Sequence, residues 1–180
     1  MGLLKIEEIP VYGYEDYKRW EGRWELINGV AYAMSPAPSI KHQKVSDNIA
    51  WQLNQLLRDC KKCFSLLPVD WKIDENTIVQ PDNLVICYEP EKEEYITKAP
   101  TLIFEILSKS TVMKDTKIKY ELYEKEGVNH YVIVDPSEKV AKVFKLKNGR
   151  YEKIKDAQNE KIKMDLKECE IEFDFSLIWA

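Results

Sequence analysis

The stretch Leu102-Ile103-Phe104-Glu105-Ile106-Leu107 decides the fold of this chain. It is almost continuously apolar, and strands of that kind lie in the middle of a sheet that is covered on both faces. Residues 64–73 and 78–87 are also typical of strands, and the turn-forming residues 74–76 separate them. The sequence therefore predicts a central buried strand with two further strands before it.

Helical patterns lie on both sides of this strand-rich region. From Ile40 to about Arg58 apolar residues recur at helical spacing, which predicts a long amphipathic helix. A second helix is expected from about Met113 to Glu126, because Gly127 readily adopts the left-handed conformation that ends a helix. Residues 131–134 form another apolar run. The order helix, three strands, helix, strand indicates an α/β fold with a mixed central sheet.

Hairpins are expected at both ends of this core. The dipeptide Asn-Gly occurs at residues 28–29 and again at 148–149, each time between strand-like runs, and it favours a tight hairpin turn. Residues 171–175 alternate between apolar and acidic side chains, as a last strand would. A length of 180 residues suits one core, so we expect a single domain over residues 1–180.

The composition is that of a globular protein, with 44% apolar and 32% charged residues. The formal net charge of -4 excludes a global basic field, so a polyanion would have to meet a local patch. The candidate patch consists of lysines at the starts of the two expected helices: Lys41, Lys44, Lys109, Lys114, Lys117 and Lys119. We expect no membrane span and no signal peptide, and therefore a cytoplasmic location.

The four cysteines are too few to indicate a disulfide scaffold, which fits a reducing compartment. Cys60 and Cys63 have the spacing with which two thiolates bind one zinc ion, but no second such pair follows. The reading that we favour is that Cys63 and Cys87 pack as small apolar side chains in strands and that Cys60 ends a helix.

Glu105 requires an explanation, because a carboxylate within an apolar strand must be paired or bound to a cation. Asp82 follows Pro81 within the preceding strand-like run, where a proline suggests a bend or bulge. If the two strands pair, both carboxylates can face one pocket, and a hard divalent cation would relieve their repulsion. The alternative is that Asp82 caps a bulge and Glu105 pairs with a lysine. The metal site would be contradicted if the two acids faced opposite sides of the sheet, or if each were neutralised by its own arginine or lysine.

Asp115, Lys119 and Tyr123 stand at positions i, i+4 and i+8 of the second expected helix. This spacing stacks them in one stripe, beside an apolar stripe of Ile118 and Leu122, and lets Lys119 reach back toward the strand of Glu105. A surface pair between Asp115 and Lys119 is the alternative reading of the same spacing.

These residues resemble the Uma-type putative restriction endonuclease family, which is placed in the PD-(D/E)XK nuclease superfamily. The likeness runs from about Glu25 to Leu146. It rests on an ordered set of motifs: Glu25-Leu26-Ile27-Asn28-Gly29, Ser35-Pro36, His42, Pro81-Asp82, Glu105-Ile106-Leu107-Ser108, Asp115-x3-Lys119-x3-Tyr123-x3-Gly127-Val128 and Tyr131-Val132-Ile133-Val134-Asp135-Pro136.

The resemblance implies a restriction-endonuclease-like core of helix, three strands, helix and strand. It also implies that Asp82, Glu105 and the carbonyl of Ile106 bind Mg²⁺ or Mn²⁺, and that a lysine assists the attacking water. Leu107 stands where the superfamily commonly has that lysine, so Lys119 is the candidate replacement. An ammonium near the water and the phosphate matters more than its position in the chain.

Four further residues are candidates for accessory roles. Tyr123 would hold Lys119 or the phosphate, or else pack half-buried, and Gln80 would hydrogen-bond in the pocket. His42 would line the mouth of the site or lie at the helix start as a surface residue. Glu25 would add an acidic ligand or lie at the edge of a hairpin.

The function expected from these features is metal-dependent hydrolysis of DNA phosphodiester bonds by an endonuclease that cleaves DNA as a possible homodimer. Two alternatives remain open: a catalytically degenerate module that binds nucleic acid or protein on the same fold, and a metal-dependent hydrolase of another phosphorylated substrate.

Overall fold

The computed structural model describes residues 9–34 and 37–180 of the chain. These residues fall into two compact units, which are described here one after the other. The first unit contains the described residues up to Ala37 together with Val69–Gln80 and Pro90–Lys98. The second contains Pro38–Pro68, Pro81–Glu89 and Ala99–Ala180. The single domain expected over residues 1–180 stays a prediction.

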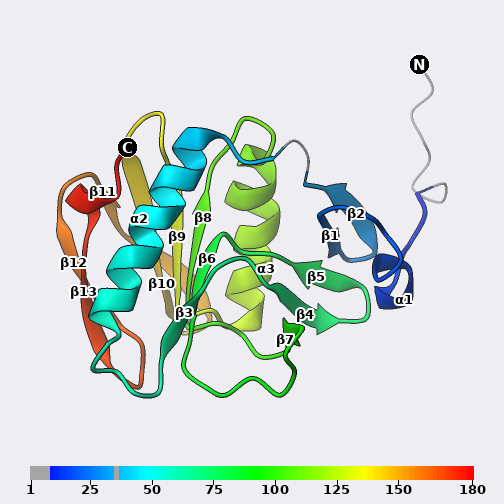
Figure 1. The fold of residues 1–180 in the computed structure, drawn as a ribbon, viewed down its shortest axis with the longest axis horizontal. Helices are drawn as coiled ribbons and strands as arrows, with labels where there is room; N and C mark the ends of the chain where they lie inside the picture. The colour runs from blue at the N-terminus through cyan, green and yellow to red at the C-terminus, as the bar shows by residue number, and fades with distance from the viewer. Residues whose placement is uncertain (1–8, 35–36) are drawn as a thin grey trace. The chain divides into compact units, whose positions relative to one another are not determined.

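The second unit is built on a six-stranded sheet with the order β11-β10-β9-β8-β6-β3 (Figure 1). The apolar stretch around Glu105 forms β8, which is buried along its whole length and lies inside the sheet, as predicted. β8 is parallel to β9 and antiparallel to β6, so the sheet is mixed. The strands are β3 (Phe64–Leu66), β6 (Asn83–Ile86), β8 (Leu102–Ile106), β9 (His130–Asp135), β10 (Val140–Lys147) and β11 (Arg150–Ala157).

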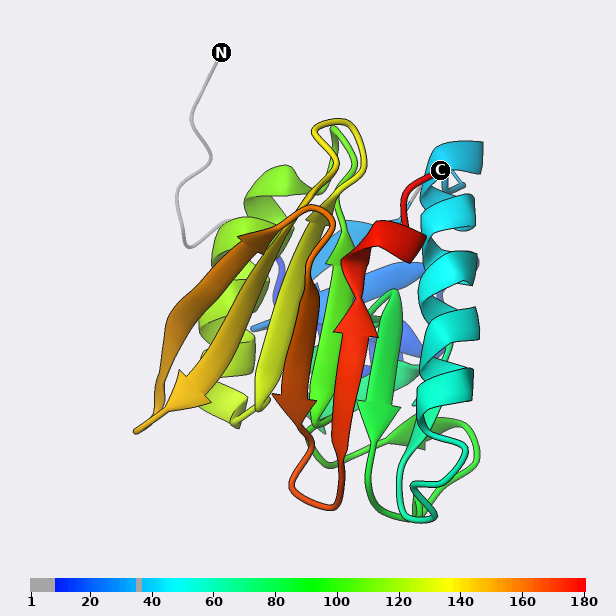
Figure 2. The same ribbon diagram turned by 90° about the vertical axis from the view of Figure 1, so that its left-hand side faces the viewer.

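The two faces of this sheet carry different coverings. Helix α2 (Ile40–Leu56) and the hairpin of β12 (Lys161–Asp165) and β13 (Glu170–Asp174) cover one face, as Figures 1 and 2 show. Phe104 of β8 belongs to the apolar core on this face, together with Val45 and Ile49 of α2. Because side chains alternate along a strand, Glu105 points to the other face, which α3 (Lys119–Glu126) covers.

The second expected helix is continuous but not uniform. Residues 112–113 are α-helical, and a π-helical segment, η2 (Lys114–Ile118), follows them and runs directly into α3. The helix ends at Gly127, whose φ of 83° is the left-handed conformation that the sequence predicted. The π-helical segment was not expected, because the sequence shows no feature of it.

The first unit holds a five-stranded sheet with the order β2-β1-β5-β4-β7 and a short helix, α1 (Tyr14–Tyr17). Its strands are β1 (Trp24–Ile27), β2 (Val30–Ala33), β4 (Asp70–Asp74), β5 (Thr77–Val79) and β7 (Tyr95–Ile96). β1 and β2 form the hairpin predicted at residues 28–29, with Asn28 and Gly29 both at positive φ. The motif Ser35-Pro36 lies outside the described residues.

Two expected strands are each divided in the structure. Residues 64–73 give β3 and β4, and residues 78–87 give β5 and β6; in both cases the two parts belong to different sheets. Pro68 and Pro81 lie at the two breaks, where a residue without an N–H cannot continue a ladder. The prediction of one continuous strand was wrong in both places, although the bend at Pro81 was anticipated. Strands β7 and β12 were not predicted.

The interpretation of the cysteines was also wrong. Cys60 is joined to Cys169 and Cys63 to Cys87, so all four form disulfides in the structure. Loop residues bring the pairs together across sequence separations of 109 and 24, which spacing alone does not reveal. Among the described residues, no helix is both long enough and apolar enough to span a membrane.

Candidate active site

Glu105 lies at the centre of the candidate site. Its side chain projects from β8 toward α3, and the residue is 2% exposed. The ammonium Nζ of Lys119 lies 2.8 Å from Glu105 Oε1, and the hydroxyl of Tyr123 donates to the same oxygen at 2.7 Å. The helical stripe predicted from the sequence therefore faces the carboxylate in the apolar strand.

Lys119 is as deeply buried as its partner, at 1% exposure. Its Nζ is also 3.7 Å from Asp115 Oδ1, and Tyr131 of β9 donates through its hydroxyl to the carbonyl of Asp115 at 2.6 Å. The Asp115 and Lys119 pair is thus not a surface pair. The neighbouring apolar stripe of Ile118 and Leu122 is only half-buried. The expected burial is reversed because the strand carboxylate requires polar partners on the helix face that covers it.

Asp82 comes directly before β6, at the point where the chain enters the central sheet. The register pairs Asn83 with Phe104, so the next position places Asp82 opposite Glu105. The backbone N–H of Ile106 donates to Asp82 Oδ2 at 2.8 Å. Asp82 therefore lies opposite Glu105 at the entry to the adjacent strand, and a metal site shared by the two acids stays a prediction.

His42 is the second partner of Asp82, with Nε2 3.3 Å from Oδ2. Burial would raise the pKa of the Asp82 carboxyl, but the hydrogen bond and charge of His42, the Ile106 N–H and the charge of Lys119 outweigh burial and lower that pKa. His42 is positioned by the start of α2, where the side chain of Ser39 accepts from the backbone N–H of His42 at 3.1 Å. Ser39 is a favoured helix-capping residue, so the first turn is fixed.

The two acids have different direct partners. Glu105 is paired with Lys119 at 2.8 Å, as the alternative reading of the sequence expected, whereas Asp82 accepts from the Ile106 N–H and lies 3.3 Å from His42 Nε2. The charge of Lys119 is the smallest of the influences that lower the pKa of Asp82. The available donors are carboxylate oxygens on adjacent strands and the backbone of Ile106, which lies against Asp82. Oxygen donors of this kind suit a hard divalent cation such as Mg²⁺.

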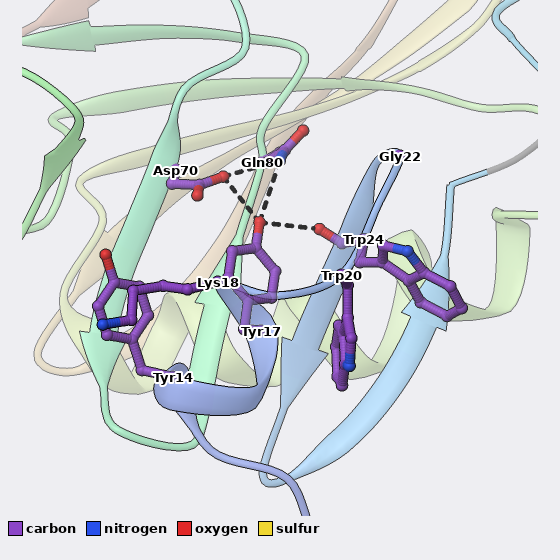
Figure 3. Close-up of a pocket in the computed structure, with 8 residues that line it drawn as sticks. All are labelled: Tyr14, Tyr17, Lys18, Trp20, Gly22, Trp24, Asp70 and Gln80. Carbon is purple, nitrogen blue, oxygen red and sulfur yellow. Dashed lines mark hydrogen bonds between the residues drawn. The ribbon is translucent and has the colours of Figure 1, made fainter.

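Gln80 and Glu25 belong to the first unit, and their contacts are described within it. Gln80 Nε2 donates to Asp70 at 2.7 Å and to the Tyr17 hydroxyl at 3.2 Å, in a pocket that Trp20 and Trp24 also line (Figure 3). Its backbone N–H donates to Glu25 Oε1 at 2.8 Å, and Glu25 is fully buried. Their accessory roles stay predictions.

The expected basic patch is smaller than the sequence suggested. Lys114 and Lys119 are buried, at 8% and 1% exposure, so they do not contribute to a surface for a polyanion. The other four lysines are exposed: Lys41, Lys44, Lys109 and Lys117. Tyr131 was not identified from the sequence, because a tyrosine within an apolar strand has the same pattern as a packed core residue.

A solved structure defines the class of this fold. The crystal structure of a putative nuclease belonging to DUF820 from Anabaena variabilis ATCC 29413 matches with a TM-score of 0.75 and 16% sequence identity. The match covers 92% of this chain and 96% of the other, so the chain has the fold of that protein. No match was found among curated proteins.

The family follows from the sequence itself. The chain belongs to the Uma2 family, described as "Putative restriction endonuclease", whose family model matches residues 14–174. The resemblance inferred from the motifs is thereby confirmed, as is the mixed α/β fold of a nuclease-like protein.

Proposed function

We propose that this protein is an endonuclease that hydrolyses phosphodiester bonds of DNA with the help of Mg²⁺ or Mn²⁺. The observation that carries the proposal is the pair of opposed acids, Asp82 directly before β6 and Glu105 in β8, with Lys119 in contact with Glu105. Membership of a restriction endonuclease family supports a nucleic-acid substrate.

Asp82, Glu105 and the carbonyl of Ile106 would hold the metal ion. Such an ion polarises a phosphate oxygen and lowers the pKa of a bound water toward neutrality. His42 and the Ile106 N–H keep Asp82 in its ionised form, which is the form that binds a cation. Tyr123 orients Glu105 by donating to one of its two oxygens, Oε1.

Lys119 would act on the substrate as a fixed ammonium. Asp115 and Glu105 contact Nζ from two elements, so its position is fixed without reorganisation. From there Nζ can donate to a phosphate oxygen or orient the attacking water. This role does not require a lysine in place of Leu107, because Lys119 on the helix places its ammonium beside the carboxylate of Glu105.

DNA would approach over the exposed lysines, Lys41 and Lys44 on α2 and Lys109 and Lys117 before and within η2. Positive side chains at these places would compensate locally for the net charge of -4. The proposal includes a homodimer, which would cut both strands of the DNA. It also includes a cytoplasmic location, where DNA is accessible.

Cleavage of supercoiled plasmid and of single-stranded DNA, with Mg²⁺, with Mn²⁺ and with EDTA, tests the proposal. We expect cleavage only with a metal ion, and a loss of at least a hundredfold in Asp82→Asn and Glu105→Gln. Glu138→Gln is the matched control, because this acid is exposed and lies in the turn after β9. Equal cleavage by wild type and Asp82→Asn would identify a contaminating nuclease and contradict the proposal.

A non-catalytic binding module is the second candidate, favoured by Leu107 and by the closed pairing of Glu105 with Lys119. It predicts DNA binding that is unaffected by EDTA and no turnover with either metal. A hydrolase of another phosphorylated substrate would instead hydrolyse a member of a panel of nucleotides and phosphodiesters in the presence of metal. It would leave DNA uncleaved under the same conditions.

A further inference from the structure

The four cysteines come together at one place in the second unit. Cys60 and Cys63 lie on the turn after α2, Cys87 follows β6 directly, and Cys169 lies between β12 and β13. The sulfur atoms of Cys60, Cys63 and Cys169 all lie within 4.8 Å of one another, and Cys87 is bonded to Cys63. Cys87 and Cys169, which are far from Cys60-x2-Cys63 in the sequence, thus lie beside it in the structure as a second pair of cysteines.

Interactions other than S–S bonds hold the same segments together. The pair Phe64–Ile86 in the ladder of β3 and β6 places Cys63 beside Cys87. The N–H of Cys63 donates to the carbonyl of Cys60 at 3.1 Å, and the N–H of Leu166 donates to the carbonyl of Cys169 at 2.8 Å. The four sulfurs would therefore remain neighbours after reduction of both disulfides.

An ion pair joins the two loops that carry the cysteines. Lys62 Nζ lies 3.0 Å from Glu168 Oε2, so residues directly adjacent to Cys63 and Cys169 in the chain are in contact. Lys61 and Lys62 also place positive charge between the first two cysteines, where it would offset the two negative charges of a zinc ion bound by four thiolates.

The spacing of the sulfurs is close to that of a zinc site. Four thiolates bind zinc in a tetrahedron with Zn–S bonds of about 2.3 Å, which separates the sulfurs by roughly 3.8 Å. The bonded sulfurs of Cys60 and Cys169 lie closer together than this and Cys63 lies within 4.8 Å of both, so the three can reach this spacing once the disulfide is reduced. Cys60 and Cys63 are buried and the other two partly buried, as is typical of a closed structural site.

We propose that Cys60, Cys63, Cys87 and Cys169 form a structural zinc site when they are reduced, as an alternative to the two disulfides. Each disulfide takes two electrons and two protons from a dithiol, which becomes a disulfide itself. The four resulting thiols then release four protons as they bind Zn²⁺. The site joins the end of α2, the end of β6 and the β12–β13 hairpin.

This zinc site is separate from the candidate active site. Asp82 precedes β6 and Cys87 follows it, and His42 and Cys60 lie near opposite ends of α2, a helix of 17 residues and therefore about 25 Å long. The zinc ion would have no contact with the substrate. Its effect would be on the stability of the second unit, and it does not depend on the proposed nuclease activity.

The test uses the full-length protein in its disulfide form and after reduction with the phosphine TCEP, which is oxidised to its oxide. Native mass spectrometry after addition of Zn²⁺ is expected to give one zinc ion more per reduced chain than per oxidised chain. Co²⁺ added to the reduced protein should give the intense visible absorption of tetrahedral thiolate coordination. Zinc should also raise the thermal midpoint of the reduced protein by several degrees.

Cys169→Ser should weaken zinc binding at least tenfold and reduce the cobalt absorption at equal concentration. Glu138→Gln is the matched control and should bind zinc as the wild type does, because this acid is exposed and lies in the turn after β9. The cobalt spectrum of the reduced wild type keeps the proposal testable even if Cys169→Ser does not fold. The zinc-site proposal would be overturned if the reduced wild type binds no zinc at the cysteines, or if its cobalt spectrum shows octahedral coordination only.

Discussion

Lys119 illustrates how a single buried residue controls the site. An ammonium at 1% exposure is stable only because Glu105 and Asp115 lie beside it, and each acid depends on the lysine in turn. Its apolar neighbours made Glu105 a candidate, and the spacing from Asp115 together with the family resemblance made Lys119 one. The sequence did not reveal the burial of Lys119, since the same spacing is common on helix surfaces.

Lys119→Met should therefore destabilise the fold as well as abolish cleavage. Removal of one partner leaves two buried carboxylates without a cation, and such losses amount to about 3 to 5 kcal/mol. Urea unfolding followed by circular dichroism measures the difference. Lys117→Met is the control, because Lys117 lies in the same helix but is exposed, and its replacement should change the free energy of unfolding by less than about 0.5 kcal/mol. A small loss in Lys119→Met would mean that its partners are satisfied in another way.

His130 makes stability depend on pH. Burial lowers the pKa of this imidazole from 6.5 to about 4, and its Nε2 lies 3.1 Å from the carbonyl oxygen of Asp165. The unfolded chain then binds more protons between pH 6.5 and 4, so stability is complete above pH 6.5 and falls as the pH decreases toward 4. The expected loss is about 3 kcal/mol across this range.

Urea unfolding at pH 7 and at pH 4.5 measures the dependence on His130. In His130→Gln, which keeps an N–H donor for Asp165, the loss between the two pH values should be clearly smaller than in the wild type. His42 and the carboxylates contribute equally to both proteins, so the difference isolates His130. Identical pH profiles would show that this side chain becomes protonated without cost in the folded state.

At the scale of elements, the sequence was informative wherever one periodicity ran uninterrupted. α2 and β8 were predicted within about two residues, because each has a single pattern along its length. The divided strands were not predicted, since apolar residues on both sides of Pro81 have the same pattern whether or not the chain changes sheets. The result matters for the candidate site, because Asp82 owes its position to that change.

The cap of α2 should influence the active site through His42. Ser39→Ala removes the side-chain acceptor for the N–H of His42, a loss of about 1 kcal/mol that would loosen the first turn. We expect cleavage to decrease several-fold and the free energy of unfolding to decrease by no more than about 1 kcal/mol. Ser39→Asp should restore cleavage because aspartate is an equally good cap. Unchanged cleavage in Ser39→Ala would show that His42 does not depend on the helix start.

For the whole molecule, charge is the property that composition describes least well. A net charge of -4 suggested weak affinity for DNA, yet four lysines are exposed near the starts of the two helical segments. The structure also removes two expected members of this patch, since burial cannot be read from residue type alone. The same limit applies to the cysteines, whose partners are set by the topology.

Replacement of Lys41 and Lys44 together by glutamine should weaken DNA binding at every sequence. Removal of one lysine–phosphate interaction makes the plot of log affinity against log salt concentration less steep by about one unit of slope, so the double variant should change the slope by about two. Fluorescence anisotropy with labelled DNA at several salt concentrations measures it. Lys125→Gln with Lys142→Gln is the control of equal charge, and an equal effect of both double variants would contradict a localised patch.

The π-helical segment η2 holds one residue more than an α-helical turn would in the same place. An α-helix advances about 100° per residue, so a deletion inside α3 between Lys119 and Tyr123 would turn the two side chains to different faces. Deletion of Thr116 would instead convert the π turn into an ordinary turn and leave Lys119 and Tyr123 facing Glu105. The gene should therefore tolerate the loss of one codon at η2 and not one turn later.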